Sequence, residues 1–273
     1  MEGQSDLNVP AALQTLGYGV IWSTGGFNPG LSSRFGRLLA STSHMVIASG
    51  VVNIWKGAPA DVAAGFADLE ARYPGRFLLG LGVSHGPLVE EYTKPHMHMV
   101  EYLDALDSTE PGVPKDCRVL AALGPRMLEL AAERSAGAHP YFVPVEHTAR
   151  AREVMGRGPL LAPEVTVVLE SNPQRARELA RKFTTGYLTT LPNYVNNFRR
   201  LGYDDDDLVD GGSDRLVDAV VAWGDAGAVA QRVGEHHDAG ADHVCVQVVT
   251  EGEGFPLEEY RELAAVLGDP QTA

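Results

Sequence analysis

Short apolar segments alternate with longer amphipathic ones along most of the chain. Seven of the apolar segments have the length and composition of buried strands: 18–22 (YGVIW), 44–52 (HMVIASGVV), 77–81 (FLLGL), 118–122 (RVLAA), 138–143 (AHPYFV), 164–169 (EVTVVL) and 243–249 (HVCVQVV). Short apolar runs separated by segments of helical periodicity are typical of repeated βα units around a parallel sheet. The pattern therefore predicts an α/β protein.

Helix start signals lie between these segments. Pro59 precedes the amphipathic stretch ADVAAGFADLEARY, Pro125 opens PRMLELAAERS, and Asn172 with Pro173 opens PQRARELARKF. Proline fits the first helical turn because the N–H that it lacks would have no partner there. Each of these stretches is therefore predicted to be a helix.

The alternation breaks at about 187–221, which contains LPNYVNNFRRLGY, the acidic run 204–207 and GGSDRLVDAVVAW. We predict a helical insertion here, between the sixth and seventh strand segments. Insertions at the rim of an α/β barrel often shape a substrate pocket. The acidic run is interpreted as a solvated loop, because nothing makes its carboxylates converge on a metal.

The length of 273 residues is close to the roughly 250 residues that are typical of a (β/α)8 barrel. No linker or low-complexity segment divides the chain, so residues 1–273 are predicted to form a single domain. A closed barrel has eight strands, whereas seven are recognised here. Only the short helical stretch VPAALQTLG precedes the first, so the usual first strand is predicted to be absent, which exposes a sheet edge.

The charge balance narrows the possible partners. The chain has 22 basic and 36 acidic residues and a net charge of −14, and no run of Lys or Arg exceeds two. This argues against binding to nucleic acid or to an anionic membrane. The N-terminal MEGQSDLNVP lacks the regions of a signal peptide, and no stretch approaches the ~18 apolar residues of a membrane span. We therefore expect a soluble, cytoplasmic protein.

No metal site is predicted. Cys117 and Cys245 are far apart and lack C-x-x-C spacing, which supports neither a disulfide framework nor a zinc ribbon. His236 and His237 are adjacent on a predicted helix, so their side chains diverge by about 100° and cannot chelate one ion well.

The strand 77–81 leads into closely spaced glycines, in GLGVSHG, that end at Gly86. Glycine lets backbone N–H groups approach a ligand, so Gly82, Val83 and Ser84 are candidates for holding a phosphate; a tight turn without a ligand is the simpler alternative. The same letters contain G-x-S-x-G, the form of a hydrolase nucleophile elbow. That motif needs a helix directly behind the serine, whereas Pro87 follows at once.

Two further strand ends carry candidate chemistry. Gly124 and Pro125 place Arg126 at a predicted helix N-terminus, which suits a phosphate or carboxylate, although a surface arginine fits the sequence equally well. His139 and Tyr141 point to one face of their strand, where an imidazole and a phenol can bind a ring or exchange a proton. A buried histidine that only makes structural hydrogen bonds is the simpler alternative for His139.

Taken together, these segments resemble the luciferase-like monooxygenase superfamily, in particular its branch that depends on the deazaflavin coenzyme F420. The similarity runs from Leu16 onward. The matching phrases are LGYGVIW, HMVIASGVVNIWKGAPADVAAGFADLEARYPGRFLLGLGVSH, ALGPRMLELAAERSAGAHPYFVPVEHTARARE, the PNY segment, GGSDRLVDAVVAWGD and AGADHVCVQVV. The resemblance implies a (β/α)8 TIM-type barrel and, together with the exposed edge, a homodimer.

The resemblance also implies roles for individual residues. Gly50 and Val51 match the place of a non-prolyl cis peptide that backs the deazaflavin ring. Gly82, Val83 and Ser84 match the segment that holds the tail phosphate of the cofactor. The remaining positions would line the same tail or face the ring and its side chain: Gly124, Pro125, Arg126, Ala138, His139 and Tyr141.

The implied reaction is hydride transfer between F420 and a small organic substrate, with His139 or Tyr141 as the proton donor. FMN in place of F420, in a monooxygenase of the same superfamily, is one alternative. A non-catalytic, degenerate barrel that serves as a partner subunit or small-molecule binder is another. It is favoured by the absent first strand and by Gly25, which stands where the family usually has an acidic or imidazole side chain.

Overall fold

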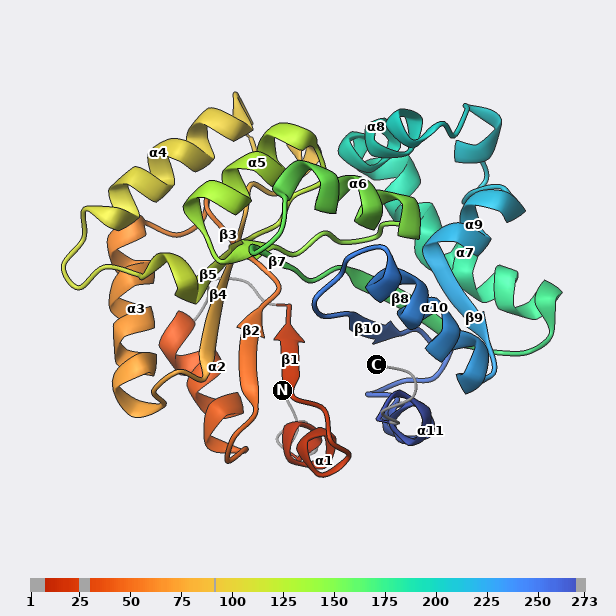
Figure 1. Cartoon of the computed structure of the whole chain (residues 1–273), viewed down its shortest axis with the longest axis horizontal. Coiled ribbons are helices and arrows are strands. Elements are labelled where there is room, and N and C mark those ends of the chain that lie inside the picture. Colours follow the sequence, from red (N-terminus) through yellow and green to blue (C-terminus); the bar gives the residue numbers. More distant parts are fainter. Residues whose placement is uncertain (1–7, 25–29, 91, 269–273) are drawn as a thin grey trace. The chain divides into compact units, whose positions relative to one another are not determined.

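The computed structural model describes residues 8–24, 30–90 and 92–268 (Figure 1). The chain divides into two compact units. Unit 1 comprises Met1–Ser84, Val89–Ala122 and Arg126–His139, and unit 2 comprises His85–Leu88, Leu123–Pro125 and Pro140–Ala273. The single-domain prediction for residues 1–273 stays a prediction, and each unit is described by itself below.

Unit 1 is a parallel sheet with its connecting helices. Its elements are α1 (Val9–Thr15), β1 (Val20–Ser23), α2 (Leu31–Ala40), β2 (Val46–Ser49), β3 (Val52–Asn53), α3 (Pro59–Arg72), β4 (Phe77–Gly82), α4 (Pro95–Asp107), η2 (Lys115–Cys117), β5 (Arg118–Leu120), α5 (Pro125–Arg134, whose first residue is assigned to unit 2) and β6 (Gly137–Ala138). The strands follow the order β1-β2-β4-β5-β6, and β3 pairs with β4. All of these pairs are parallel.

Apolar strands form this sheet because helices connect every parallel pair and shield it from water. In β4, five of the six residues are buried and only Leu78 is partly exposed. Phe77 packs against the rings of Phe35 on α2 and Phe66 on α3. Helices α2 and α3 therefore shield this part of the sheet from water.

Unit 2 contains a smaller parallel sheet and most of the remaining helices. Its elements are η1 (Gly86–Leu88), α6 (Val145–Met155), β7 (Leu160–Leu161), β8 (Glu164–Leu169), α7 (Pro173–Thr190), α8 (Pro192–Leu201), η3 (Asp206–Leu208), α9 (Asp214–Val220), β9 (Val221–Gly224), α10 (Ala226–Asp238), β10 (Cys245–Val248) and α11 (Leu257–Leu267). The three-stranded sheet has the order β10-β8-β9, with both pairs parallel.

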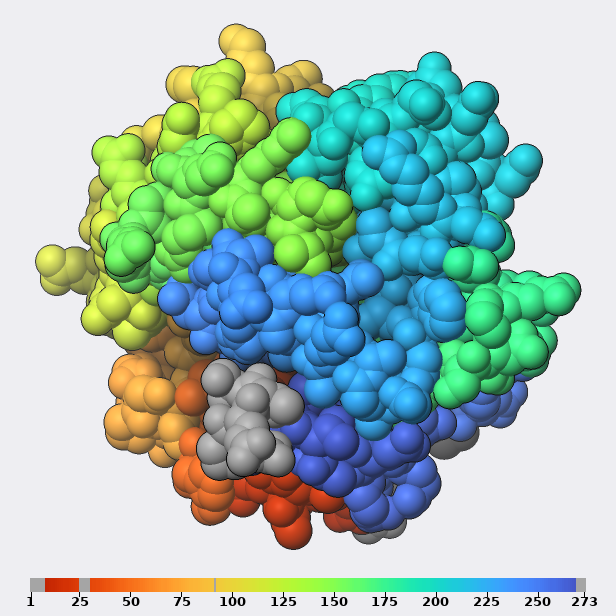
Figure 2. All heavy atoms as spheres, turned by 45° about the vertical axis from the view of Figure 1, so that its right-hand side comes forward, coloured from red at the N-terminus to blue at the C-terminus, as the bar shows by residue number. Residues whose placement is uncertain are grey.

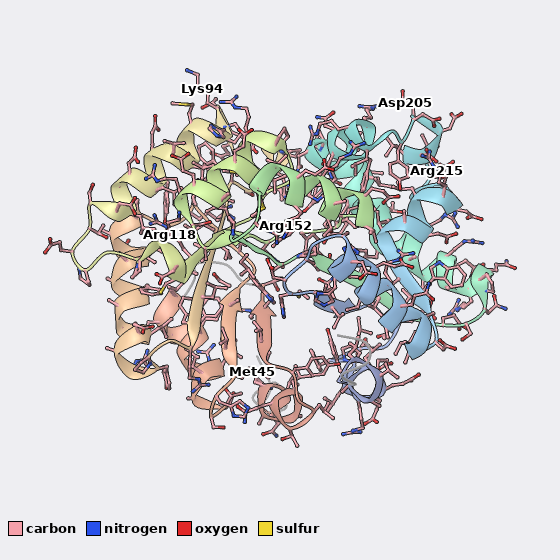
Figure 3. The ribbon with its side chains drawn as sticks, viewed as in Figure 1. Met45, Lys94, Arg118, Arg152, Asp205 and Arg215 are labelled. Atoms are coloured by element: carbon pink, nitrogen blue, oxygen red, sulfur yellow. The ribbon has the colours of Figure 1, made fainter. Side chains whose placement is uncertain are left out.

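Aromatic packing holds the helices of unit 2 together. The fully buried rings of Phe142 and Phe198 lie edge to face, with centroids 5.4 Å apart. Tyr194 and Tyr187 add further edge contacts in the same cluster. Two ion pairs add to this packing: Arg152 of α6 binds Asp242 at 2.6 Å, and Arg215 of α9 binds the buried Asp207 at 2.6 Å. Figure 3 labels both arginines.

All seven segments that the sequence predicts as strands contain strand residues, and the three predicted helices are α3, α5 and α7. The sequence predicts neither β7 nor β9. Strand β9 is the longer of the two. Its four residues follow α9 directly, since Val220 ends the helix and Val221 begins the strand. With no turn residue between them, the change from helical to strand periodicity leaves no mark in the sequence. Residues 187–220 are otherwise mainly helical, through the end of α7, α8, η3 and α9.

The predicted absence of a first strand concerns the start of the chain. Residues 1–7 lie outside the described part, and from residue 8 onward α1 comes first and β1 is the first strand. Gly25 likewise lies outside the described residues. Within the described part, no helix has the length and apolar character that a membrane crossing needs.

Candidate functional site

The carboxyl end of β2 carries a tight bulge. The peptide bond between Gly50 and Val51 is cis, which is the geometry that the resemblance implies there. The Ser49 hydroxyl donates to the Gly80 carbonyl at 3.0 Å and accepts from the Gly80 N–H at 2.8 Å. A Cβ on Gly80 would overlap the Ser49 carbonyl oxygen, and one on Gly82 would lie 2.6 Å from Val51 Cγ2. Two glycines of β4 therefore make the room that the bulge occupies.

Two aromatic rings lie beside this bulge. The imidazole of His139, directly after β6, stacks on Trp22 of β1 with centroids 3.9 Å apart and planes inclined by 10°. A Cβ on Gly50 would lie 3.7 Å from Trp22 Cβ and 3.9 Å from His139 Nε2. The ends of β1, β2 and β6 thus meet around Gly50. His139 is buried, and its backbone N–H continues the ladder to Leu120 at 2.9 Å.

The segment after β4 is also constrained. Trp55 donates its indole N–H to the Val83 carbonyl at 2.6 Å and stacks on His98 at 3.9 Å. Ser84 follows with φ of 59°, a left-handed conformation that is uncommon for a residue with a side chain. This geometry holds the Gly82–Ser84 backbone in one shape.

The nucleophile-elbow interpretation of Ser84 fails on this geometry. Behind the serine comes η1, a three-residue 3-10 turn, where the motif needs an α-helix. His85 bonds through Nδ1 to Asn193 Oδ1 at 2.8 Å, and within the described residues no imidazole bonds the Ser84 hydroxyl. A serine hydrolase is not supported.

The three residues around the start of α5 lie in different surroundings. Gly124 and Pro125 belong to unit 2, where His147 donates from Nε2 to the neighbouring Leu123 carbonyl at 2.9 Å. Arg126 belongs to unit 1, and its Nη2 lies 3.4 Å from His96 Nδ1 on α4. Its guanidinium therefore has a partner on a neighbouring helix.

Tyr141 lies in a buried polar network of unit 2. Its hydroxyl lies 2.9 Å from the Tyr187 hydroxyl and donates to Gln247 Oε1 at 3.1 Å. Burial raises the pKa of Tyr141 above its usual value, and the nearby Glu164 adds to the rise. The phenol therefore keeps its proton at neutral pH.

Glu164, the first residue of β8, holds the backbone next to Tyr141. Its Oε2 accepts from the Phe142 N–H at 3.1 Å, and its Oε1 accepts from the Thr166 hydroxyl at 2.8 Å. Phe142 has φ of 55°, so this contact fixes a left-handed residue beside the phenol. Full burial raises the pKa of Glu164 to about 7, although both hydrogen bonds act to lower it.

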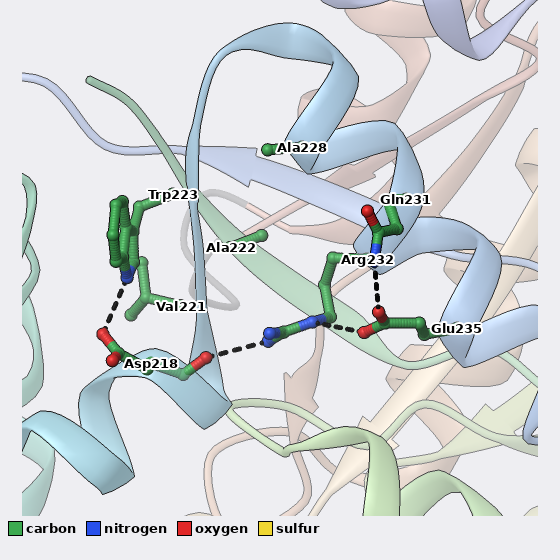
Figure 4. Close-up of a pocket in the computed structure, with 8 residues that line it drawn as sticks. All are labelled: Asp218, Val221, Ala222, Trp223, Ala228, Gln231, Arg232 and Glu235. Carbon is green, nitrogen blue, oxygen red and sulfur yellow. Dashed lines mark hydrogen bonds and ion pairs between the residues drawn. The ribbon is translucent and has the colours of Figure 1, made fainter. Parts of the chain in front are cut away.

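A separate cavity of about 240 Å³ lies in unit 2, between β9, the end of α9 and α10 (Figure 4). Its polar groups are paired with one another. The Trp223 indole donates to Asp218 Oδ1 at 2.8 Å, and Arg232 binds Glu235 at 2.9 Å and the Asp218 carbonyl at 3.1 Å. Because these groups already have partners, this cavity is a weaker candidate for ligand binding.

Unit 1 thus brings together a subset of the predicted residues, and these lie at its strand ends: Gly50, Val51, Gly82, Ala138 and His139. The other candidates of unit 1, Val83, Ser84 and Arg126, lie in the loop after β4 and at the start of α5. Tyr141, Gly124 and Pro125 belong to unit 2. Sequence reasoning missed Trp22, Trp55 and Glu164. Trp22 and Trp55 stand at or just after strands, which is the only signal that could have marked them.

Comparison with known proteins decides the family. The sequence model of the luciferase-like monooxygenases matches residues 7–243. The chain belongs to the luciferase-like monooxygenase family. Family membership supports an oxidoreductase or monooxygenase activity. No curated protein sequence matches the chain significantly.

Solved structures of this family share the fold. An F420-dependent secondary alcohol dehydrogenase, in complex with an F420-acetone adduct, is 15% identical with a TM-score of 0.73, over 98% of this chain and 96% of that one. The F420-dependent tetrahydromethanopterin reductase from Methanopyrus kandleri is 16% identical with a TM-score of 0.76, over 100% and 96%. The oxygenating constituent of 3,6-diketocamphane monooxygenase from Pseudomonas putida, in complex with FMN, is 16% identical with a TM-score of 0.63, over 96% and 90%. The predicted fold class, a barrel of the luciferase-like type, is confirmed.

Proposed function

We propose that this protein is an oxidoreductase that transfers a hydride between coenzyme F420 and a small organic substrate. The observation that carries the proposal is the glycine-lined bulge at Gly50 and Val51, beside the stacked Trp22 and His139. Similarity to two F420-dependent enzymes supports it. Similarity to an FMN-containing oxygenase favours FMN as the second candidate.

The residues of unit 1 fit a flat cofactor ring. Gly50 has no side chain, and the nearest side-chain atoms to the position of a Cβ belong to Trp22 and His139 at 3.7 and 3.9 Å. Apolar and aromatic surfaces of this kind suit stacking with a ring and the exclusion of water. When bound, F420 would supply the hydride chemistry, so the protein needs no nucleophile of its own.

A reduction that uses a hydride also needs a proton. The two candidate donors are His139 in unit 1 and Tyr141 in unit 2. The raised pKa of Tyr141 keeps its hydroxyl protonated, so the phenol can donate at neutral pH only if the product that accepts the proton is strongly basic, such as an alkoxide. The homodimer and the cytoplasmic location stay predictions.

Equilibrium titration of the purified protein with oxidised F420 and with FMN tests the proposal. We expect micromolar binding of F420 and no comparable binding of FMN. If the protein bound FMN but not F420, FMN would replace F420 as the proposed cofactor. If it bound neither, the non-catalytic barrel would be favoured.

A pair of variants locates the binding surface. Gly50→Leu fills the space beside Trp22 and His139, so we expect F420 affinity to fall at least about tenfold. Gly19→Leu is the matched control, because nothing lies within 4 Å of a Cβ at this exposed glycine. Circular dichroism verifies that both variants fold. Equal affinity of a folded Gly50→Leu variant and the wild type would contradict a ring site at this bulge.

A further inference from the structure

Strand β10 lies at the end of the three-stranded sheet of unit 2. The sheet order is β10-β8-β9, so β10 has one side toward β8 and one outer side. Among the described residues, no strand pairs with that outer side. The backbone N–H groups of Cys245 and Val249 donate toward β8 at 2.9 and 2.8 Å. Because successive residues of a strand point their backbone groups to opposite sides, Val246 and Val248 direct theirs outward.

The hydroxyl of Tyr260 occupies this outer side. It donates to the Val246 carbonyl at 3.1 Å and accepts from the Val248 N–H at 3.3 Å. In a parallel ladder, one residue of a neighbouring strand makes the same two bonds: its N–H donates to one residue, and its C=O accepts from the residue two positions further on. A single phenol oxygen therefore takes the place of one residue of a neighbouring strand.

Helix α11 and the loop before it hold the Tyr260 ring in place. Tyr260 and the fully buried Leu263 share one face of α11, and both pack in the apolar cluster that contains Val165 and Val248 of the sheet (Figure 1). Phe255, in the loop, stacks on the Tyr260 ring with centroids 4.9 Å apart and planes inclined by 8°. Figure 2 shows α11 at the surface, in dark blue. The exposed Phe255 ring thus has a structural partner in Tyr260.

The sequence around β10 favours association with an identical strand. Residues 243–249, HVCVQVV, include four valines and contain no Pro, Gly, Asp, Glu, Lys or Arg. Uncharged segments of high β propensity pair readily with one another wherever a sheet edge is open, and charged side chains or proline are the usual protection. Residues 243–247 are each partly exposed, so the segment is not covered by the rest of the described chain. An edge of this composition needs another form of protection.

We propose that Tyr260 closes the outer edge of β10 against pairing with the β10 strand of a second copy of this chain. A two-fold axis would place the two identical strands antiparallel, so the outward groups of Val246 and Val248 in each copy would bond to the other copy. The competition is direct, because the Tyr260 hydroxyl already uses one C=O and one N–H that this pairing needs. No cofactor takes part, so this inference does not depend on the proposed function.

The test compares the wild type with Tyr260→Phe and with Tyr203→Phe. Tyr260→Phe keeps the ring that stacks on Phe255 and removes only the hydroxyl. Tyr203→Phe is the matched control, because Tyr203 is a buried tyrosine of the same unit whose hydroxyl has no hydrogen bond to any residue that the structure describes. Sedimentation equilibrium measures self-association over a range of protein concentrations. Hydrogen exchange measures the protection of the amides in residues 243–249.

We expect Tyr260→Phe to associate beyond the wild-type state at a concentration at least about tenfold lower than either of the other two proteins. In dilute solution, the Val248 amide of this variant should exchange at least about tenfold faster than in the wild type, because it has lost its acceptor. In the associated form, residues 243–249 should become protected. Protection that appears only elsewhere in the chain would refute the proposal.

A second substitution separates edge pairing from a general loss of stability. Val246→Pro, added to Tyr260→Phe, removes an outward N–H, and proline at such an edge position blocks the addition of a strand. Circular dichroism verifies that the single and double variants fold. We expect the double variant to sediment as the wild type does. The proposal is overturned if folded Tyr260→Phe associates no more strongly than the wild type, or if the folded double variant associates as strongly as Tyr260→Phe.

Discussion

The candidate residues of the two units are arranged by different physical means. In unit 1 the bulge at Gly50 and Val51 is shaped by steric fit, because Gly80 and Gly82 leave no room for a methyl group. In unit 2 the surroundings of Tyr141 are shaped by buried polar groups, with Glu164 hydrogen-bonded to the neighbouring backbone. The first arrangement is sensitive to volume, and the second to protonation.

This difference shows how each arrangement is kept in one conformation. A close-packed backbone has few alternatives, since the interior tolerates little change in volume. A buried carboxyl has two protonation states, and its environment decides which is favoured. The glycine-lined bulge should therefore be insensitive to pH, whereas the network around Glu164 should respond to it.

Gly80→Ala tests the steric half of this comparison and should have the largest effect. The added methyl would overlap a backbone oxygen of Ser49, which cannot rotate away as a flexible side chain could. We expect the free energy of unfolding to fall by more than about 3 kcal/mol, at the upper end of what overpacking costs. Urea unfolding at pH 7 measures the loss.

Gly19→Ala in the same unit is the control. Its Cβ would meet nothing within 4 Å, and the glycine is exposed, so we expect a change within about 0.5 kcal/mol. The loss at Gly80 should also be the same at pH 5 and pH 8. Comparable stability of the two variants would show that the bulge is not sterically determined.

Glu164→Gln tests the electrostatic half. The folded protein holds the pKa of Glu164 at about 7, above the ordinary value of 4.5. An acid with a raised folded pKa is favoured in its protonated form, so the wild type loses stability as pH rises from about 4.5 to about 7. The loss amounts to about 3 kcal/mol, from about 1.4 kcal/mol for each pH unit. Glutamine has the same shape without the charge, so the variant should not show this loss.

The measurement is the difference in unfolding free energy between the variant and the wild type at several pH values. It should move by about 3 kcal/mol in favour of Glu164→Gln between pH 4.5 and pH 8. Buried His147 and His236, whose pKa values are lowered to about 4 and about 3, destabilise both proteins alike as pH falls, and so cancel in the difference. If the difference in unfolding free energy between Glu164→Gln and the wild type stayed constant with pH, burial would not raise the pKa of Glu164.

The two units also differ in how much of them the sequence predicts. The strands and the first helices follow from apolar periodicity and proline positions, and Gly50, Gly82 and His139 are recognisable as strand-end residues. The stacking of Trp22 on His139 cannot be recognised in the sequence, because the two residues are 117 positions apart. Trp22 lies in β1, and His139 follows β6. Glu164 looks like the polar start of a strand, and only the fold shows that it is buried against Phe142. Strand β9 was missed because no turn residue separates it from α9.

Helix capping provides the smallest test of the same comparison. In unit 2, three helices begin with a side-chain cap, from Asn172, Ser213 and Asp225. In unit 1, the residue before α3 is the exposed Ala58, which has extended backbone geometry but no side chain that can accept a hydrogen bond. Side-chain caps thus stabilise three helix starts in unit 2, whereas the start of α3 in unit 1 has no such cap.

Reciprocal substitutions measure this contribution. Asp225→Ala removes an acceptor that bonds the Ala228 N–H at 2.8 Å, so we expect a loss of about 1 kcal/mol. Ala58→Asp introduces an acceptor at a position whose backbone already suits a cap, and we expect a gain of similar size. Both side chains are exposed, so the two changes alter little else. Ala58→Asp could give no gain in stability while Asp225→Ala still costs about 1 kcal/mol. The stability of the start of α3 would then be limited by its packing and not by its missing cap. The steric control found at the bulge of unit 1 would in that case extend to its helix ends.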